Sequence, residues 1–302
     1  MTTTAIKRNT SPEKGVLDYI LPRNPVTRNR EFRLVPKSVE RTLGSYLYPS
    51  MIASQGGYYS KHDYHHLVEK VGKKIAQRSD RSDLSFQFSV IDSSQLNAWC
   101  LPGGKIAFYR GIIEKLKIEK GSLGVGSFSL EEKIAAVMGH EITHACARHS
   151  ARSLEFTAVL YAIFSTLHYV LKIFISNKEA ELQKNNPSAK NSILNKADEL
   201  TLAKTVDQAF DALYNTLFSL LQKHGSRQHE FEADKYGMVY LKRAGYDPKV
   251  AIWLQKFFAK QHPSENGILD KILHLFSSHP TSEERVKENI KTLELIRQGR
   301  LK

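Results

Sequence analysis

The chain has 302 residues, 41% of them hydrophobic and 25% charged, which is ordinary for a globular protein with a buried core and excludes a fibre or a wholly disordered chain. The 44 Lys and Arg residues outnumber the 31 Asp and Glu residues, and the net charge of +13 favours an anionic partner such as a lipid surface or a nucleic acid. No Lys/Arg block typical of a nucleic-acid-binding arm is present, so nucleic acid is not expected as a partner, and the 2 cysteines are too few for a disulfide framework.

Residues 1–36 are rich in Pro, Asn and Arg and predict an irregular leader. The first part of this leader contains no apolar segment typical of a secretory signal peptide, because prolines and acidic residues interrupt it. We expect a single domain over residues 37–302. Its first elements are two helices, one that starts near Val39 and ends at Gly56-Gly57 and one over residues 61–78.

The hydrophobic period then changes from that of a helix to that of a strand. Phe86, Phe88 and Val90 alternate with polar residues. Residues 96–101 and 106–109 flank the sequence Pro-Gly-Gly, which is typical of a turn. The sequence therefore predicts a small antiparallel sheet among helices.

A loop rich in Gly and Ser precedes the next predicted helix. Ser129 is the predicted N-cap of this helix, and Glu132 three residues later completes a capping box. No proline occurs over residues 104–186, so the helix can continue without a break through His140 and His144.

Residues 156–175 form the most apolar stretch, and its length is that of a membrane-spanning helix, about 20 residues. His168 and Lys172 lie inside the stretch, and a charge within a span costs roughly 2.5 kcal/mol or more. We therefore expect a buried or membrane-dipping helix, with a membrane span as the alternative. The helix would belong to an insertion at about residues 150–225 that is mobile or faces a membrane.

The sequence His-Glu-Ile-Thr-His at residues 140–144 is typical of a metal site. On a helix, His140 and His144 lie one turn apart on the same face, so both imidazoles can bind one metal ion. Glu141 projects beside them, where it can take a proton from a metal-bound water. Zinc is the expected metal, with one ion per chain, because these ligands suit it and leave a position for water. The alternative is a pair of surface histidines, and the apolar residues around the motif argue against it.

A zinc site of this kind needs a third protein ligand, and Glu230 is the best candidate. The continuation His-x-x-Gly-x-x-His is absent, and His149, five residues after His144, is predicted to point away from the site. Glu230 and Asp234 share a helix face, whereas Glu232 is rotated about 160° from that face. Glu230 would bind the metal, and Asp234 would accept the outer N–H of a ligand histidine. An exposed acidic helix face explains the spacing equally well.

Four segments, taken in order, resemble the HtpX/Oma-type zinc metallopeptidases, which are relatives of the Ste-type CAAX prenyl protease. The segments are Asn97–Gly104, Gly139–His144, Ser226–Gly237 and His279–Arg285. Asn24–Thr27, Arg33–Val35 and the apolar stretch after the metal-binding helix are similar to the Oma-like branch in particular. The chain lacks the several clear spans of integral-membrane relatives, so processing of CAAX proteins is not expected.

The resemblance implies a fold and a substrate site. The fold would be α+β, mainly helical and zincin-like (gluzincin), with the small antiparallel sheet beside the zinc-binding helix. Strand 96–101 would border the active cleft and pair with an extended peptide, so that Asn97 and Ala98 bind the substrate. A role for Asn97 in the turn at the strand end is the alternative.

The resemblance also implies roles for residues around the metal. Glu230 would be the third ligand, with Asp234 as its support. His279 would stabilise the oxyanion or occupy the open metal position as a gate, and Arg285 would support the loop of His279.

The expected function is that of a zinc-dependent metalloendopeptidase, and the resemblance implies misfolded or membrane-associated proteins as substrates in protein quality control. The basic charge and the apolar stretch predict association with an anionic membrane, peripheral rather than integral. The alternative is a latent or chaperone-like protein that binds clients at the edge strand and has a closed metal site.

Overall fold

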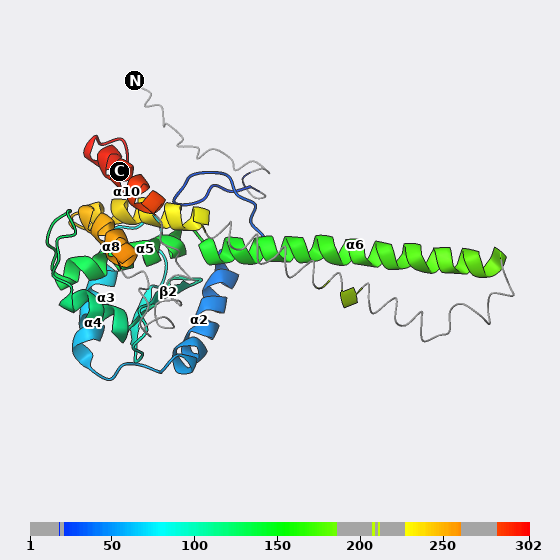
Figure 1. The fold of residues 1–302 in the computed structure, drawn as a ribbon, viewed down its shortest axis with the longest axis horizontal. Coiled ribbons are helices and arrows are strands. Elements are labelled where there is room, and N and C mark those ends of the chain that lie inside the picture. Colours follow the sequence, from blue (N-terminus) through cyan, green and yellow to red (C-terminus); the bar gives the residue numbers. More distant parts are fainter. Residues whose placement is uncertain (1–17, 19–20, 186–206, 209–210, 212–226, 261–282) are drawn as a thin grey trace, which may run out of the picture. The chain divides into compact units, whose positions relative to one another are not determined.

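The computed structural model describes residue 18 and residues 21–185, 207–208, 211, 227–260 and 283–302 (Figure 1). The chain divides into two compact units, residues 1–150 with 231–302 and residues 151–230. The second boundary lies between residues 230 and 231, inside one helix over residues 227–243. This helix carries both Glu230 and Asp234. The leader over residues 1–36, the single domain over 37–302 and the insertion at about 150–225 stay predictions.

The first two predicted helices are confirmed as α2 (Lys37–Ser54) and α3 (His62–Ala76). α2 ends just before the predicted stop at Gly56 and Gly57, whose φ angles of 123° and 75° are easily adopted only by glycine. Both helices bury one apolar face, so tertiary packing stabilises them in addition to their own hydrogen bonds.

The sheet contains β1 (Gln87–Ile91), β2 (Ala98–Leu101) and β3 (Lys105–Tyr109), in the order β1-β3-β2. β2 and β3 form the predicted antiparallel hairpin, but β1 pairs with β3 in parallel, so the expectation of a purely antiparallel sheet is wrong. Residues 92–97 reverse the chain direction, so β2 runs antiparallel to β1. β3 then lies between β1 and β2 and pairs with both. β3 is buried along its whole length, which suits the central position.

The two faces of the sheet are covered by different helices. Ile106 and Phe108 of β3 belong to the main core with residues of α3 and of α5 (Leu130–Cys146). Ala107 and Tyr109 pack with residues of α2 in a smaller cluster. Successive side chains of β3 therefore point to opposite faces of the sheet, and each face packs in a different hydrophobic cluster.

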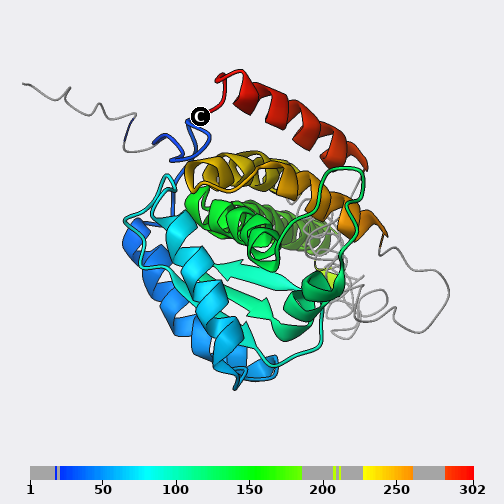
Figure 2. The same ribbon diagram turned by 90° about the vertical axis from the view of Figure 1, so that its left-hand side faces the viewer.

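α5 begins as predicted, because Ser129 and Glu132 form the complete capping box. α4 (Arg110–Ile118) was not predicted, although its buried apolar residues have helical spacing. α5 packs against α3 and β2, α8 (Lys249–Lys260) packs against α5, and α10 (Glu283–Arg297) packs against α8. Figure 2 shows this succession of helices above the sheet, with α10 outermost.

α6 (His149–Asn185) contains the apolar stretch. In the part of the chain that the structure describes, residues 149–178 form the one helix that is long and apolar enough to cross a membrane, judged by length and composition. Several large apolar side chains on it are exposed, among them Tyr161 at 62% and Phe174 at 59%.

Candidate metal centre

Two helices cross in direct backbone contact at a pair of glycines. A Cβ atom on Gly237 would lie 3.1 Å from the carbonyl of Gly139 and from the amide nitrogen of His140. A larger side chain at either position would push α5 away from the helix over residues 227–243. Asp234 and Glu230 lie about one and two turns before this crossing, on the helix that meets the His-Glu-Ile-Thr-His segment.

The structure brings together the three residues that the sequence predicts as metal ligands. One possible ligand atom from each of His140, His144 and Glu230 lies within 4.8 Å of the other two. The Nε2 atoms of the two histidines are 3.1 Å apart. His140 and Glu230 are buried, and His144 is partly exposed. Among the described residues, no other group of three or more His, Cys, Asp or Glu residues could hold a metal ion.

Asp234 connects His140 to two further elements. Its Oδ1 atom lies 3.0 Å from His140 Nδ1. The guanidinium of Arg285, on α10, donates two hydrogen bonds of 2.7 Å to the same carboxylate, and Gln255, on α8, donates one of 3.1 Å. Burial alone would raise the pKa of Asp234, but the charge and hydrogen bonds of Arg285, with those of His140, lower the pKa below its ordinary value. Asp234 is therefore an ionised hydrogen-bond acceptor.

The proton positions in this group suit a metal ion. Because an ionised carboxylate only accepts hydrogen bonds, His140 Nδ1 donates to Asp234, and the neutral form of the ring, which is the form that binds a metal, has its lone pair on Nε2. That lone pair is on the side of His144 Nε2, 3.1 Å away. Two nitrogens bound to one tetrahedral zinc ion at 2.0–2.1 Å would be about 3.3 Å apart. Two imidazole nitrogens and a carboxylate oxygen thus form a set of donors that fits zinc.

Glu141 lies beside this group and is 2% exposed. It lines a cavity together with His140 and Ala98. The other lining residues are mostly apolar and come from α4, α5, α8 and α10: Ile112, Val137, Leu254, Gln255, Phe258 and Arg285. The carboxylate predicted as general base therefore shares a largely apolar cavity with a predicted metal ligand and with the predicted substrate strand.

The residues predicted to bind substrate lie at the start of β2. β2 has a strand neighbour on one side only among the described residues, so it is an edge of the sheet. Ala98 forms part of the cavity wall. The side-chain oxygen of Asn97 accepts a hydrogen bond of 2.9 Å from the amide of Ala98. His279, predicted near the metal, lies outside the described residues.

Sequence reasoning missed two partners of Asp234. Gln255 gave no signal, because an isolated polar residue on an apolar helix does not show what it contacts. For Arg285 the resemblance implies only support of the loop of His279, which lies outside the described residues. The structure places its guanidinium on Asp234, in a buried ion pair that connects α10 to the helix over residues 227–243.

Comparisons with known proteins find a matching family model and several relatives. The model of the family described as peptidase family M48 matches residues 64–292. The chain is 27% identical over 274 residues to the mitochondrial metalloendopeptidase OMA1 of Schizosaccharomyces pombe, an alignment that covers 90% of this chain and 65% of that protein.

Two further relatives are matched over smaller shares of their length. The mitochondrial metalloendopeptidase OMA1 of Arabidopsis thaliana is 28% identical, over 72% of this chain and 34% of that protein. The beta-barrel assembly-enhancing protease of Escherichia coli (strain K12) is 24% identical, over 73% of this chain and 37% of that protein. Much of each of these two proteins therefore has no counterpart in the alignment.

Proposed function

Because the chain belongs to peptidase family M48, we propose that it is a zinc metalloendopeptidase in which His140, His144 and Glu230 hold the metal. The observation that carries the proposal is the convergence of these three ligands within 4.8 Å, with His140 oriented by the ionised carboxylate of Asp234. Relatives that are named metalloendopeptidase or protease support the same reaction class.

The residues around the ligands have separate roles in peptide hydrolysis. When bound, zinc supplies Lewis acidity, which polarises a carbonyl and makes a water molecule acidic near neutral pH. Glu141 is the general base: its carboxylate takes the proton of the attacking water and passes it to the leaving amine. The buried position of Glu141 keeps this proton transfer away from bulk solvent. His279 is proposed to stabilise the oxyanion or to gate the metal.

The substrate is proposed to be an extended segment of a misfolded or membrane-associated protein, in protein quality control. An extended peptide can add to β2 as a further strand, since β2 is an edge strand within the described part of the chain and begins at the cavity. Main-chain hydrogen bonds would then hold the peptide without regard to its sequence, and Asn97 and Ala98 would contact it first. The apolar cavity beside Glu141 suits a hydrophobic side chain, which unfolded proteins expose.

The substitution Glu141→Gln tests the reaction. It keeps the size of the side chain and removes the base, so we expect one zinc ion per chain in both proteins but cleavage of a casein-type substrate by the wild type only. Proton transfer by such a base contributes about 10²–10⁴-fold to the rate, which sets the minimum loss. Zinc content by elemental analysis and cleavage by gel or fluorescence are measured on the same samples.

Glu131→Gln is the matched control, because Glu131 lies on the same helix but pairs with Lys70 near the surface, and its cleavage rate is expected to equal that of the wild type. Zinc in both proteins with cleavage in neither would favour the latent or client-binding alternative. Absence of zinc from the wild type would contradict the proposal at its centre.

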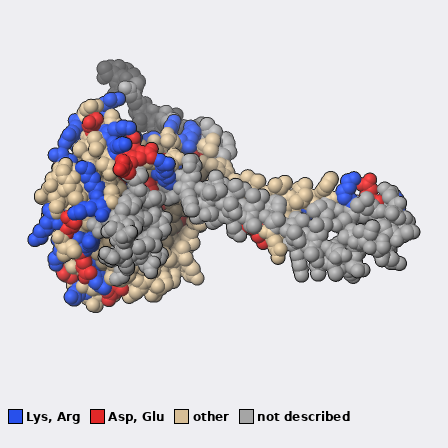
Figure 3. Space-filling model, viewed as in Figure 1, with Lys and Arg blue, Asp and Glu red and all other residues tan. Residues whose placement is uncertain are grey.

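We further propose that the protein associates with an anionic membrane, at its surface rather than across it, through α6. The exposed apolar residues of α6 and the net charge of +13 support this. Figure 3 shows Lys and Arg interleaved with Asp and Glu on the described residues of one side, which fits a general attraction better than a single basic patch.

The double substitution Leu167→Glu with Phe174→Glu tests the membrane proposal. Burying two such side chains in an interface is worth about 3 kcal/mol or more, so we expect binding to vesicles with anionic lipid to fall by more than tenfold. Flotation of the full chain with vesicles measures this. Alkaline carbonate should release the wild type if it is peripheral; retention would indicate a span. Unchanged flotation of the variant would contradict a role for α6.

A further inference from the structure

His144 has a buried histidine neighbour that the helical spacing did not predict. α5 ends at Cys146, Arg148 has a left-handed φ of 61°, and α6 begins at His149. Because of this break, His149 does not continue the helix of His144. The ring of His149 instead contacts the ring of His144. The Nδ1 atoms of His149 and His144 are 2.7 Å apart, and His149 Nε2 lies 3.0 Å from Glu232 Oε2.

These contacts place the protons of both rings. The carboxylate of Glu232 accepts a hydrogen bond from His149 Nε2, so the neutral ring of His149 has its lone pair on Nδ1. At 2.7 Å, the two Nδ1 atoms share one hydrogen bond, and the proton therefore belongs to His144. His144 is left with a lone pair on Nε2, the atom that lies 3.1 Å from His140 Nε2.

We propose that His149, held by Glu232, is a positioning residue that keeps His144 in the tautomer and orientation needed to bind the metal. The inference rests on the metal centre of the proposed function. Each ligand histidine then has its own support from the helix over residues 227–243: Asp234 contacts His140 directly, and Glu232 reaches His144 through the ring of His149. Such supports commonly contribute 10–100-fold to metal affinity.

The burial of the pair favours this role over a solvated surface contact. His149 is 3% exposed, and the side chain of Glu232 is 14% exposed. A buried imidazole needs hydrogen-bond partners for both nitrogens, and here the two partners are a carboxylate and a predicted metal ligand. The arrangement uses the ring as a rigid spacer, because Nδ1 and Nε2 point in different directions.

Two substitutions of His149 separate hydrogen bonding from packing. His149→Leu fills the buried space but removes the acceptor, and we expect the zinc dissociation constant to rise by about 10–100-fold. His149→Asn places its side-chain oxygen near the position of Nδ1, and it is expected to restore affinity to within a few-fold of the wild type. Affinity is measured by competition with a chelator, beside the absorption spectrum of the cobalt-substituted protein and the thermal unfolding of the metal-free protein.

The design includes two further variants. His66→Leu removes an exposed histidine on α3 and should leave the zinc dissociation constant unchanged, which controls for adventitious binding by surface histidines. If His149→Leu does not fold, Glu232→Ala replaces it as the test: this position is partly exposed, and we expect zinc binding about tenfold weaker, because His149 is no longer held in one tautomer.

The outcomes are distinguishable from failure of the proposed function. Zinc binding by the wild type that His149→Leu does not weaken would overturn the positioning role alone, as would equal weakening by Leu and Asn. If Glu232→Ala is the variant tested, a zinc affinity equal to that of the wild type would likewise overturn the positioning role. Absence of zinc from the wild type would overturn the metal centre together with this inference.

Discussion

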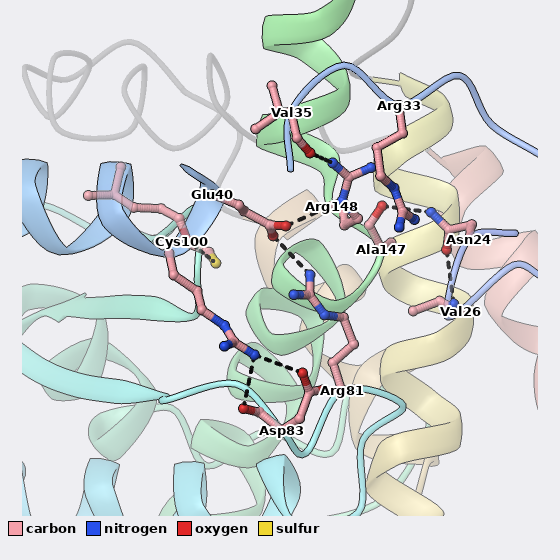
Figure 4. A network of polar contacts seen from close by, with 12 residues as sticks. Asn24, Val26, Arg33, Val35, Glu40, Arg81, Asp83, Cys100, Ala147 and Arg148 are labelled. Atoms are coloured by element: carbon pink, nitrogen blue, oxygen red, sulfur yellow. Dashed lines mark hydrogen bonds and ion pairs between the residues drawn. The ribbon is translucent and has the colours of Figure 1, made fainter. Parts of the chain in front are cut away.

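Two clusters of buried polar side chains flank the end of α5, and they differ in how their charges are balanced. The arginine cluster, made of Glu31, Glu40, Arg33, Arg81 and Arg148, sets three guanidinium groups against two carboxylates. Figure 4 shows Glu40 between Arg81 and Arg148. In the metal centre, Asp234 is also paired with an arginine, but the ring nitrogens of the two ligand histidines face each other.

The difference separates a structural cluster from a candidate metal-binding one. Each charge of the arginine cluster meets an opposite charge of the same protein, and Arg148 also donates to the carbonyl of Val35, which fastens the N-terminal segment to the end of α5. In the candidate metal centre, possible ligand atoms of His140, His144 and Glu230 lie within 4.8 Å of one another, an arrangement that suits a cation. Burial of polar groups alone does not indicate function; the direction of the lone pairs does.

The largest expected effect on stability comes from the substitution Glu40→Gln. Arg81 and Glu40 are each 1% exposed in their side chains, and Arg148 is 0% exposed. Removing one partner of a buried ion pair leaves an uncompensated charge, which costs about 3–5 kcal/mol. We expect the free energy of unfolding in urea to fall by this amount while the zinc dissociation constant of the folded protein stays unchanged.

An exposed ion pair provides the control for the buried ion pairs of the arginine cluster. Asp83 pairs with Arg41, but both side chains are about half exposed, at 52% and 46%. Asp83→Asn should change the unfolding free energy by less than about 1 kcal/mol. His149→Leu should show the reverse of Glu40→Gln, with a loss of zinc affinity and little loss of stability in the metal-free protein. Loss of zinc affinity in folded Glu40→Gln would instead show that the two clusters act as one.

Local signals made much of the fold predictable. The capping box at Ser129, the glycine stop of α2 and the turn before β3 each depend on a few neighbouring residues, and each is confirmed. The parallel pairing of β1 with β3 was not predictable in this way, since it depends on which strand takes the central position. The resemblance to the Oma-like metallopeptidases is confirmed by the family match and by relatives named metalloendopeptidase OMA1.

The contacts around His140, His144 and Glu230 were less predictable than the convergence of these three residues. The prediction that His149 points away assumed one continuous helix, and it is wrong because the chain breaks at Arg148. A left-handed conformation costs a non-glycine residue roughly 1–2 kcal/mol. The buried side chain of Arg148 forms ion pairs with Glu31 and Glu40, and no local pattern of the sequence shows those distant partners.

The smallest effect expected from the arginine cluster concerns Glu31 and pH. Burial alone would raise the pKa of Glu31, but hydrogen bonds from Asn24, Arg33 and Arg148 lower it below the ordinary value of 4.5. A carboxyl with a lowered pKa stabilises the folded state fully above pH 4.5, and this contribution is lost as the pH falls below 4.5 through the folded pKa. Glu31→Gln should therefore be less stable than the wild type by about 1 kcal/mol at pH 7.

The pH dependence of that difference distinguishes the charge of Glu31 from its packing. Urea unfolding of the wild type and of Glu31→Gln is measured in parallel from pH 7 to pH 3, and the difference in unfolding free energy is expected to shrink once the pH is below 4.5. If the difference in unfolding free energy stays constant from pH 7 to pH 3, the loss of stability in Glu31→Gln comes from packing of the glutamine side chain and not from the missing charge. The arginine cluster would then be held by Glu40, and the anchoring of the N-terminal segment to α5 would depend on the Val35 carbonyl rather than on a second ion pair.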